Sequence, residues 1–167
     1  PTLTQPVYVD REMWEKIVLN LLSNAFKFTF AGEIRVSLSS EAESAVLRVA
    51  DTGTGIPEAE VPRLFERFYR VDKARSRESG GTGLGLAIAK HIVLAHGGTI
   101  RAESELNHGS TFLFVIPAAA ESAGAQPDRE LLAVSARELA LEPHLHVLRR
   151  HPRPLLCGLE QARRPAL

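Results

Sequence analysis

Apolar residues recur with helical spacing in the first segment of the chain and with strand-like alternation after it. Residues 12–29 place their apolar positions on one arc of a helical wheel, which predicts a helix with one buried face. Asp10 is a suitable N-cap for this helix, and residues 7–9 predict a short strand before it. Residues 33–39 alternate between polar and apolar side chains, and with residues 45–50 they predict an antiparallel hairpin.

The middle of the chain predicts a long polar connection followed by a second helix. Residues 58–67 predict one or two short helical turns. Residues 70–81 are polar and lack apolar periodicity, which predicts a long mobile loop. Residues 85–95 present an apolar helical face, and residues 99–103 and 110–116 predict two closing strands.

The composition changes after the last of these strands. Residues 1–117 form one predicted domain, and residues 118–127, which are mostly small, predict a linker. Residues 128–142 have the pattern of an amphipathic helix. The segment 128–167 offers too little apolar pattern for a second core, so we expect it to be loosely ordered.

The overall composition is that of one globular domain with an appendage. The chain has 167 residues, of which 44% are hydrophobic and 24% charged. The 20 Lys and Arg residues balance the 20 Asp and Glu residues, so we expect no nucleic acid partner. Cys157 is the one cysteine, which excludes an internal disulfide. No apolar run approaches the roughly 20 residues of a membrane-spanning helix.

The first residues of the chain indicate where the protein is located in the cell and whether the chain is part of a longer protein. No secretion signal opens the chain, and it begins at Pro1 rather than at a methionine. We therefore expect a cytoplasmic segment of a longer protein, which as a whole is free to be anchored in a membrane.

Three polar residues form a stripe on the predicted first helix. Asn20, Asn24 and Lys27 occupy positions i, i+4 and i+7, so they lie on one face beside the apolar arc. Amide oxygens suit a hard cation such as Mg²⁺, and a lysine ammonium suits phosphate. A solvated face with two incidental asparagines is the alternative, and this stripe alone leaves both open.

A glycine-rich turn, Asp51-Thr52-Gly53-Thr54-Gly55, follows the strand at residues 45–50. The alternate glycines let the backbone approach a ligand closely. An aspartate at the end of a buried strand needs a hydrogen-bond donor, and the exocyclic amine of a purine would serve. A tight turn with a local Asx hydrogen bond explains the same residues, and for Asp-x-Gly alone it is the commoner case.

A second glycine-rich segment, Gly80 to Gly85, runs directly into the helix predicted at residues 85–95. Free amide groups at a helix start, together with the positive end of its dipole, suit phosphates. The segment is not a Walker A loop, because no Gly-Lys-Ser/Thr follows. It is not a dinucleotide fingerprint either, because a loop rather than a strand precedes it.

An aromatic and basic stretch lies between the two glycine-rich segments. Phe65 and Phe68 are three residues apart, and we expect both rings to pack into the core and anchor the base of a lid. Arg70 and Arg75 lie on the predicted mobile loop. They are either part of a solvated charge run or basic residues that fold over phosphates.

Taken in this order, the four segments resemble the ATP-binding catalytic domain of sensor histidine kinases, within the gyrase, Hsp90, histidine kinase and MutL superfamily. The resemblance covers residues 7–117 and rests on the N box (20–29), G1 box (51–57), F box (65–68) and G2 box (81–85). It implies an α+β fold of the Bergerat type. This fold is a two-layer α/β sandwich in which helices cover one face of a mixed, mostly antiparallel sheet.

The resemblance also implies roles for the residues of the first helix and the first turn. Asn24 would hold Mg²⁺ through its side-chain oxygen, with Asn20 supporting the triphosphate. Lys27 would reach phosphate, and Phe28 would lie near the adenine. Asp51 would accept a hydrogen bond from the adenine amino group.

The other implied contacts come from the glycines, the last strand and the lid. Gly53 and Gly55 would let the base and ribose approach, and Thr111 would lie beside the adenine through a water molecule. Arg70 and Arg75 would neutralise phosphate charge. The end of the lid around the phosphates would be shaped by Gly81, Thr82, Gly83, Leu84 and Gly85.

Position 20 separates phosphoryl transfer from hydrolysis within the superfamily. The ATP-hydrolysing relatives place a glutamate there to activate water, whereas Asn20 cannot act as a base. The resemblance thus implies a protein-histidine kinase that uses ATP and Mg²⁺. Its catalytic candidates are Asn20, Lys27, Arg70 and Arg75. Phe30 departs from the proline of many members, but it touches no proposed ligand.

The phosphoacceptor motif of the family is not found around any of the six histidines. The implied partners are therefore the histidine-bearing dimerisation domain of the same full-length protein, through which it would form a homodimer, and the receiver domain of a response regulator. Two alternatives stay open, an anti-sigma-factor-type serine kinase and a regulatory nucleotide-binding module that acts by protein contacts. Intact Asn24, Asp51 and Gly83 disfavour a loss of nucleotide binding.

Overall fold

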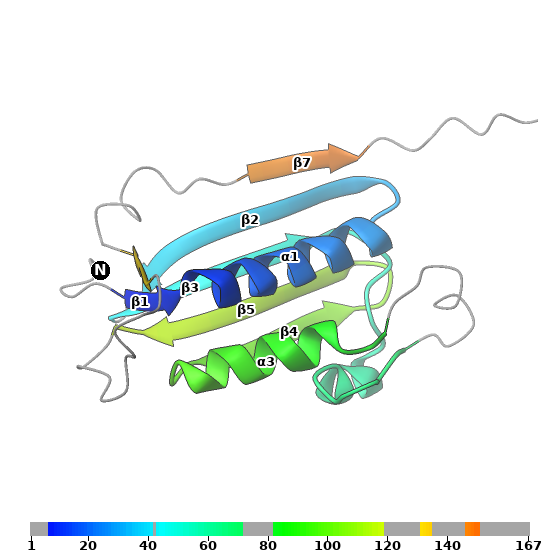
Figure 1. The fold of residues 1–167 in the computed structure, drawn as a ribbon. Coiled ribbons are helices and arrows are strands. Elements are labelled where there is room, and N and C mark those ends of the chain that lie inside the picture. The colour runs from blue at the N-terminus through cyan, green and yellow to red at the C-terminus, as the bar shows by residue number, and fades with distance from the viewer. Residues whose placement is uncertain (1–6, 42, 72–81, 119–130, 135–145, 151–167) are drawn as a thin grey trace, which may run out of the picture.

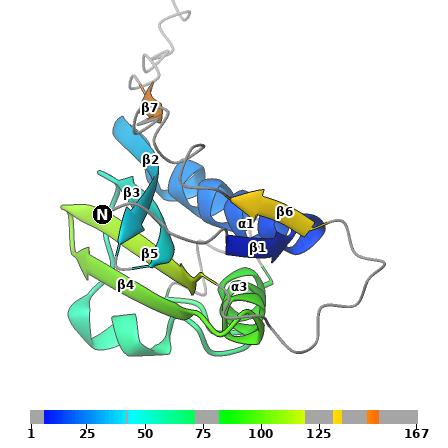
Figure 2. The same cartoon turned by 90° about the vertical axis from the view of Figure 1, so that its left-hand side faces the viewer.

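A five-stranded antiparallel sheet covered on one face by two α-helices forms the body of the molecule (Figures 1 and 2). The computed structural model describes residues 7–41, 43–71 and 82–118, and the backbone of residues 131–134 and 146–150. The helices are α1 (Arg11–Phe28), α3 (Gly85–Ala95) and the 3₁₀ helix η1 (Glu58–Arg63). The strands are β1 (Val7–Asp10), β2 (Gly32–Glu41), β3 (Ser44–Asp51), β4 (Thr99–Glu105), β5 (Gly109–Pro117), β6 (Leu131–Val134) and β7 (His146–Arg150).

The first helix begins and ends where the sequence predicts. The Asp10 side chain accepts a hydrogen bond from the Met13 amide at 3.0 Å, which caps the N-terminus. Ile17, Leu21 and Ala25, one helical turn apart, are buried against the sheet. This apolar stripe fixes which face of α1 points outward, and so it also fixes the direction of the polar stripe beside it.

The sheet has the strand order β4-β5-β3-β2-β7, and every pairing within it is antiparallel. The predicted fold class is confirmed, but the sheet is not mixed in the described part of the chain. The connection that contains α3 leads from β3 to β4, which run in the same direction. Strand β5 lies between these two strands, so the crossover creates no parallel neighbours.

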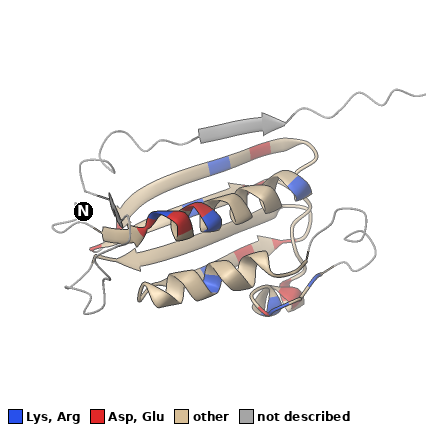
Figure 3. Cartoon of the chain, viewed as in Figure 1, with Lys and Arg blue, Asp and Glu red and all other residues tan. Residues whose placement is uncertain are grey.

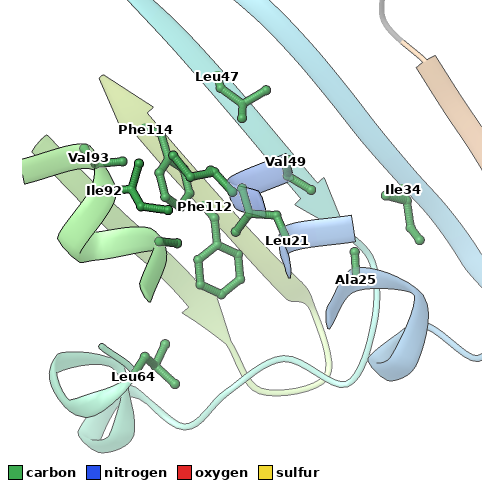
Figure 4. Packing of buried hydrophobic residues seen from close by; sticks show 12 residues of the cluster. Leu21, Ala25, Ile34, Leu47, Val49, Leu64, Ile92, Val93, Phe112 and Phe114 are labelled. Carbon is green, nitrogen blue, oxygen red and sulfur yellow. The ribbon is translucent and has the colours of Figure 1, made fainter. Parts of the chain in front are cut away.

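The hydrophobic core lies between the sheet and the two helices. Figure 4 shows Ile92 and Val93 of α3 and Leu21 of α1 around Phe112 and Phe114 of β5. The Phe114 side chain is fully buried, and burial of one such ring stabilises the fold by roughly 2–3 kcal/mol. A smaller cluster of Val7, Val9, Ala45 and Ile116 attaches β1 to the end of the sheet.

The segment after β5 differs from the prediction where the structure describes it. Leu131–Val134 forms strand β6 and pairs with β1, so the amphipathic helix predicted over residues 128–142 is wrong at these positions. His146–Arg150 forms β7, which pairs with β2 (Figure 1). Open strand edges offer unpaired backbone groups, and these override a weak helical pattern. The rest of that predicted helix, and most of the predicted linker, lie outside the described residues.

The loop predicted over residues 70–81 also falls mostly outside the described residues, which stop at Val71 and resume at Thr82. The turns predicted at residues 58–67 are present as η1 and a few irregular turns. No helix in the described part of the chain is both long and apolar enough to span a membrane.

Candidate functional site

The polar stripe of α1 begins against the start of α3. The Asn20 amide nitrogen donates to the Lys16 carbonyl at 2.8 Å, which fixes the orientation of the carboxamide. A Cβ atom placed on Gly85 would lie 2.5 Å from Asn20 Oδ1. Because only hydrogen occupies that place in glycine, the Asn20 side chain can lie directly on the first residue of α3.

The N-terminus of α3 presents backbone amides that nothing in its own sequence caps. Leu84 is the N-cap residue, and it makes no side-chain capping hydrogen bond. The Ile88 amide bonds back to the Leu84 carbonyl at 2.9 Å, so the first intrahelical bond begins only there. The amides of residues 85–87 are therefore available to an anion, and the helix dipole favours a negative charge at this end.

The other end of the α1 stripe contacts the glycine-rich turn after β3. The Thr54 amide donates to the Phe28 carbonyl at 3.1 Å. A Cβ atom on Gly53 would lie 2.4 Å from that same carbonyl oxygen, so only glycine allows this approach. Asn20 and Phe28 are eight residues apart, and α1 therefore holds the two glycine-rich segments about 12 Å apart along its axis.

The Asp51 carboxylate lies at the end of β3 on the face of the sheet that the helices cover. It accepts a hydrogen bond from the Gly53 amide at 2.8 Å. Burial raises the pKa of Asp51 above its ordinary value, while hydrogen bonds from the Gly53 and Ser110 amides and the Thr29 hydroxyl act in the opposite direction. A partly buried carboxylate of this kind is suited to accept a further hydrogen bond from a ligand amine.

A shallow cavity of about 190 Å³ opens beside the turn. Its lining includes two of the predicted site residues, Phe28 and Gly53, but neither Asn24 nor Asp51. The full lining consists of Phe28, Phe30, Ala31, Thr52, Gly53, Thr54 and Asn107. Phe28 is 41% exposed, so its ring can cover a flat ligand at this edge.

Lys27 supplies a cation in the last turn of α1, apart from the charged residues that crowd the first half of the helix (Figure 3). The first half contains the ion pairs Arg11–Glu15 and Glu12–Lys16. In the described part of the chain no carboxylate pairs with Lys27, whose ammonium lies 5.2 Å from the centre of the Phe28 ring. Its charge is thus available to an anionic ligand.

The aromatic stretch after η1 is only partly as predicted. Phe65 packs against the core, but Phe68 is 69% exposed, so its expected core position is wrong. The Phe68 backbone has φ +63°, in the left-handed region that non-glycine residues rarely adopt. The Phe68 amide donates to the Gly83 carbonyl at 3.0 Å, and this bond joins the two ends of the 72–81 segment.

Arg70 follows this turn and has an unusual guanidinium. Its Nε and Nη2 atoms are buried, and neither has a hydrogen-bond partner in the described structure. Leaving charged donors buried without an acceptor is costly, so the position favours an anionic ligand group. Arg75 and Gly81, which were predicted to act beside it, lie outside the described residues.

Comparison with known proteins agrees with this arrangement. The model of the family described as "Histidine kinase-, DNA gyrase B-, and HSP90-like ATPase" matches residues 9–120. The chain belongs to this ATPase family.

Its similarity extends to curated proteins and to solved structures. The chain is 45% identical over 114 residues to the sensor histidine kinase WalK of Bacillus subtilis (strain 168), covering 66% of this chain and 19% of WalK. It is 38% identical to the mycobacterial sensor histidine kinase MprB, with a TM-score of 0.58, covering 65% of this chain and 74% of that structure. Full-length ShkA, solved in complex with AMPPNP, matches with a TM-score of 0.60 and 34% identity over 71% of this chain and 24% of that one. This chain therefore spans about a fifth of WalK.

The register of β5 against β3 shows that Ser110, rather than the predicted Thr111, is the neighbour of Asp51. Thr111 pairs with Ala50, whereas Ser110 pairs with Asp51. Side chains alternate between the two faces of a strand, so Thr111 lies on the opposite face of the sheet from Asp51. The neighbour of Asp51 is Ser110, which is 8% exposed and whose amide bonds the carboxylate. The sequence could have indicated this, because Ser110 is two residues before the apolar Phe112. Both side chains therefore lie on the same, helix-covered face of β5.

A metal ion would depend on few protein ligands in this member of the family. Among the described residues, no three His, Cys, Asp or Glu side chains gather into a metal-binding group. Asn24 is half-buried on the polar stripe, one helical turn from Asn20, and its amide oxygen suits a hard cation. Such a site fits Mg²⁺ that arrives with a nucleotide, because Mg²⁺ commonly uses phosphate oxygens and water for its remaining ligands.

Proposed function

We propose that this chain is the catalytic ATP-binding part of a two-component sensor histidine kinase. It binds Mg-ATP and donates the γ-phosphoryl group to a histidine on a dimerisation domain elsewhere in the longer protein. The observation that supports this most strongly is the placement of Asn20 and Phe28 of one helix against two glycine-rich segments. One segment carries a partly buried carboxylate suited to a purine amine, and the other carries free helix amides suited to phosphates.

The residues divide between the two ends of the nucleotide. Asp51 would accept a hydrogen bond from the adenine amino group, and Phe28 would cover the base. Gly53 and Gly55 would let the backbone approach the base and ribose. Asn24 would hold Mg²⁺, which when bound neutralises the phosphate oxygens.

The phosphate end would combine helix amides with cations. The amides at the start of α3 would bind phosphate oxygens, in a segment that contains Gly83, Leu84 and Gly85. Lys27 and Arg70 would neutralise the charge, since neither cation has an acidic partner among the described residues. Arg75 would neutralise phosphate charge in the same way, and Gly81 and Thr82 would help to shape the segment around the phosphates.

Asn20 favours transfer to a protein acceptor over hydrolysis. Its amide nitrogen is engaged by the Lys16 carbonyl at 2.8 Å, and an amide cannot take a proton from water. Water near the γ-phosphate would thus stay a weak nucleophile. A histidine from another domain brings its own nucleophilic nitrogen, so it does not need this base.

We further propose the context of the chain in the full-length protein. The catalytic domain comprises residues 1–117, residues 118–127 are a linker, and residues 128–167 are a tail. Its partners are the histidine-bearing dimerisation domain and the receiver domain of a response regulator. It acts in the cytoplasm, where its substrate ATP is available.

A nucleotide titration with the 167-residue chain tests the proposal. We expect saturable binding of Mg-ATP, measured by calorimetry, and little phosphorylation of the chain itself, because the acceptor histidine lies elsewhere. Asp51→Asn should weaken binding by at least about tenfold, which is the loss of one hydrogen bond to a charged group. Wild-type affinity in Asp51→Asn would contradict the proposed site.

A further inference from the structure

Ser104 of β4 makes three hydrogen bonds to two other segments around the base end of the site, the residues after the glycine-rich turn and the start of β5. We infer that Ser104 is a positioning residue for adenine recognition, which acts through the glycine-rich turn and through Ser110 rather than by touching the nucleotide. The inference rests on the proposed function, since it assigns a role in building the same site.

The three hydrogen bonds of Ser104 converge on one hydroxyl group. The Ile56 amide, directly after the glycine-rich turn, donates to Ser104 Oγ at 2.8 Å. Ser104 Oγ donates to the Gly109 carbonyl at 2.9 Å, at the start of β5. Its third partner is the Ser110 hydroxyl, also at 2.9 Å. A side chain that joins a loop and two strands in this way fixes their relative positions.

The hydrogen-bonding capacity of Ser104 determines the direction of the third bond. A serine hydroxyl has one donor and two acceptor positions. The donor is used by the Gly109 carbonyl, and one acceptor is used by the Ile56 amide. The Ser110 hydroxyl therefore donates to Ser104, and all three positions of Ser104 are occupied. Alanine at this position would leave the Ile56 amide without its acceptor.

The strand register carries the effect of Ser104 to Asp51. Ser104 lies opposite Ser110 across the β4–β5 pair, and Ser110 lies opposite Asp51 across the β5–β3 pair. The three side chains thus form a polar row on the helix-covered face of the sheet. The Ser110 amide also donates to the Asp51 carboxylate. Movement of Ser110 would therefore be transmitted directly to the proposed adenine acceptor.

The glycine-rich turn is held by the same β4–β5 hairpin at two further points. Gly55 has φ +62°, and a Cβ atom on it would lie 1.9 Å from the Glu105 carbonyl oxygen. The Asn107 amide donates to the Thr54 carbonyl at 2.7 Å. The turn therefore contacts the β4–β5 hairpin on one side and α1 on the other. Ser104 supplies the side-chain hydrogen bonds between the hairpin and the end of the turn.

The test compares ligands that use both ends of the site with a ligand that uses only one. In the 167-residue chain, Ser104→Ala should raise the Kd for Mg-ATP about tenfold, equivalent to about 1.4 kcal/mol. The Kd for Mg-tripolyphosphate, which has no base, should change by less than about twofold. Hydrogen exchange of the Ile56 amide should accelerate in the variant, because its acceptor is removed.

The matched control is Ser40→Ala at the far end of β2. The Ser40 hydroxyl is buried and has no hydrogen-bond partner in the described structure, so the same chemical change there should leave the Kd values of both ligands unchanged. If Ser104→Ala does not fold, Ser104→Thr keeps the hydroxyl and should retain at least half of the ATP affinity, whereas Ser104→Val, of the same shape without the hydroxyl, should not.

The outcomes separate this inference from the proposed function. Wild-type protein that binds tripolyphosphate and ATP equally well would contradict the proposed adenine site itself. Wild-type protein that prefers ATP, together with a Ser104→Ala variant of unchanged ATP affinity, would overturn only the role of Ser104. A parallel loss of both ligands in Ser104→Ala would also overturn it, because general destabilisation then explains the result.

Discussion

The Asn20 carboxamide lies on Gly85, so that a methyl group on this glycine would approach Asn20 Oδ1 to 2.5 Å. The contact joins the polar stripe of α1 to the amides at the start of α3. The contact is possible because Gly85 has no side chain. It places the Asn20 carboxamide of α1 beside the free backbone amides at the start of α3.

Gly85→Ala tests this contact directly. Alanine favours the helix over glycine by up to about 1 kcal/mol, and the clash is with the end of a side chain that can move. We therefore expect little change in the thermal unfolding midpoint, but about tenfold weaker Mg-ATP binding, because Asn20 must leave its position.

A double-mutant cycle with Asn20→Ala provides the control for Gly85→Ala. When Asn20 is already truncated, Gly85→Ala should cost little further affinity, so the two effects should not add. Additive losses in ATP affinity would mean that the two positions act independently.

Asp51→Asn should weaken ATP binding without lowering the thermal stability of the domain. Burial raises the pKa of Asp51, so folding disfavours its charged form, and the associated stability is present at low pH and is lost as pH rises through the folded-state pKa. At pH 7 the variant should therefore unfold at the same temperature as wild type or at a higher one. The two melting curves should converge towards acidic pH, where Asp51 is protonated.

Calorimetric unfolding at several pH values provides this measurement, with Glu58→Gln as a control that removes an exposed carboxylate from η1. A wild-type protein that gains stability over Asp51→Asn as pH rises would show that the hydrogen bonds to the carboxylate outweigh its burial.

Asn24→Ala should remove the metal-dependent part of nucleotide affinity. If the Asn24 oxygen holds Mg²⁺, chelation of the metal should weaken ATP binding in wild type by about tenfold and in the variant by much less. Ser23→Ala, an exposed neighbour on α1, is the helix-matched control. An undiminished effect of the chelator in Asn24→Ala would place the metal on other ligands.

Phe65 and Phe68 should respond oppositely to truncation. Phe65 packs on the core, so Phe65→Ala should lower the free energy of unfolding by about 2–3 kcal/mol. Phe68 is exposed with φ +63°, a conformation in which glycine is not strained, so Phe68→Gly should be neutral or stabilising by up to about 1 kcal/mol. Urea denaturation measures both changes, and equal losses would contradict the exposed position of Phe68.

Truncation after Ala118 tests the proposed domain boundary. The shortened chain loses β6 and β7 but keeps both described clusters of buried core residues. We expect it to bind Mg-ATP with a Kd within about twofold of the full chain. It should also unfold a few degrees lower, because the outer edges of β1 and β2 lose their backbone partners. A truncated chain that does not fold would extend the domain to the last strand.

Local patterns in the sequence were sufficient for most elements of the fold. The Asp10 cap and the helical periodicity after it fixed α1, and alternation fixed β2, because burial of one face constrains each residue in turn. The four boxes and their order likewise determined the family, because each box needs particular residue types at fixed spacing. Asn20, Asp51 and Gly85 were all identified at this level.

Only the tertiary structure determined which of these residues meet. The contact between Asn20 and Gly85 joins positions 65 residues apart, and the row from Ser104 through Ser110 to Asp51 depends on the register of three strands. Such long-range pairings follow from packing and edge hydrogen bonds, which leave no local periodicity in the chain. For the same reason the pairing of Leu131–Val134 with an open strand edge could not be read from its own residues.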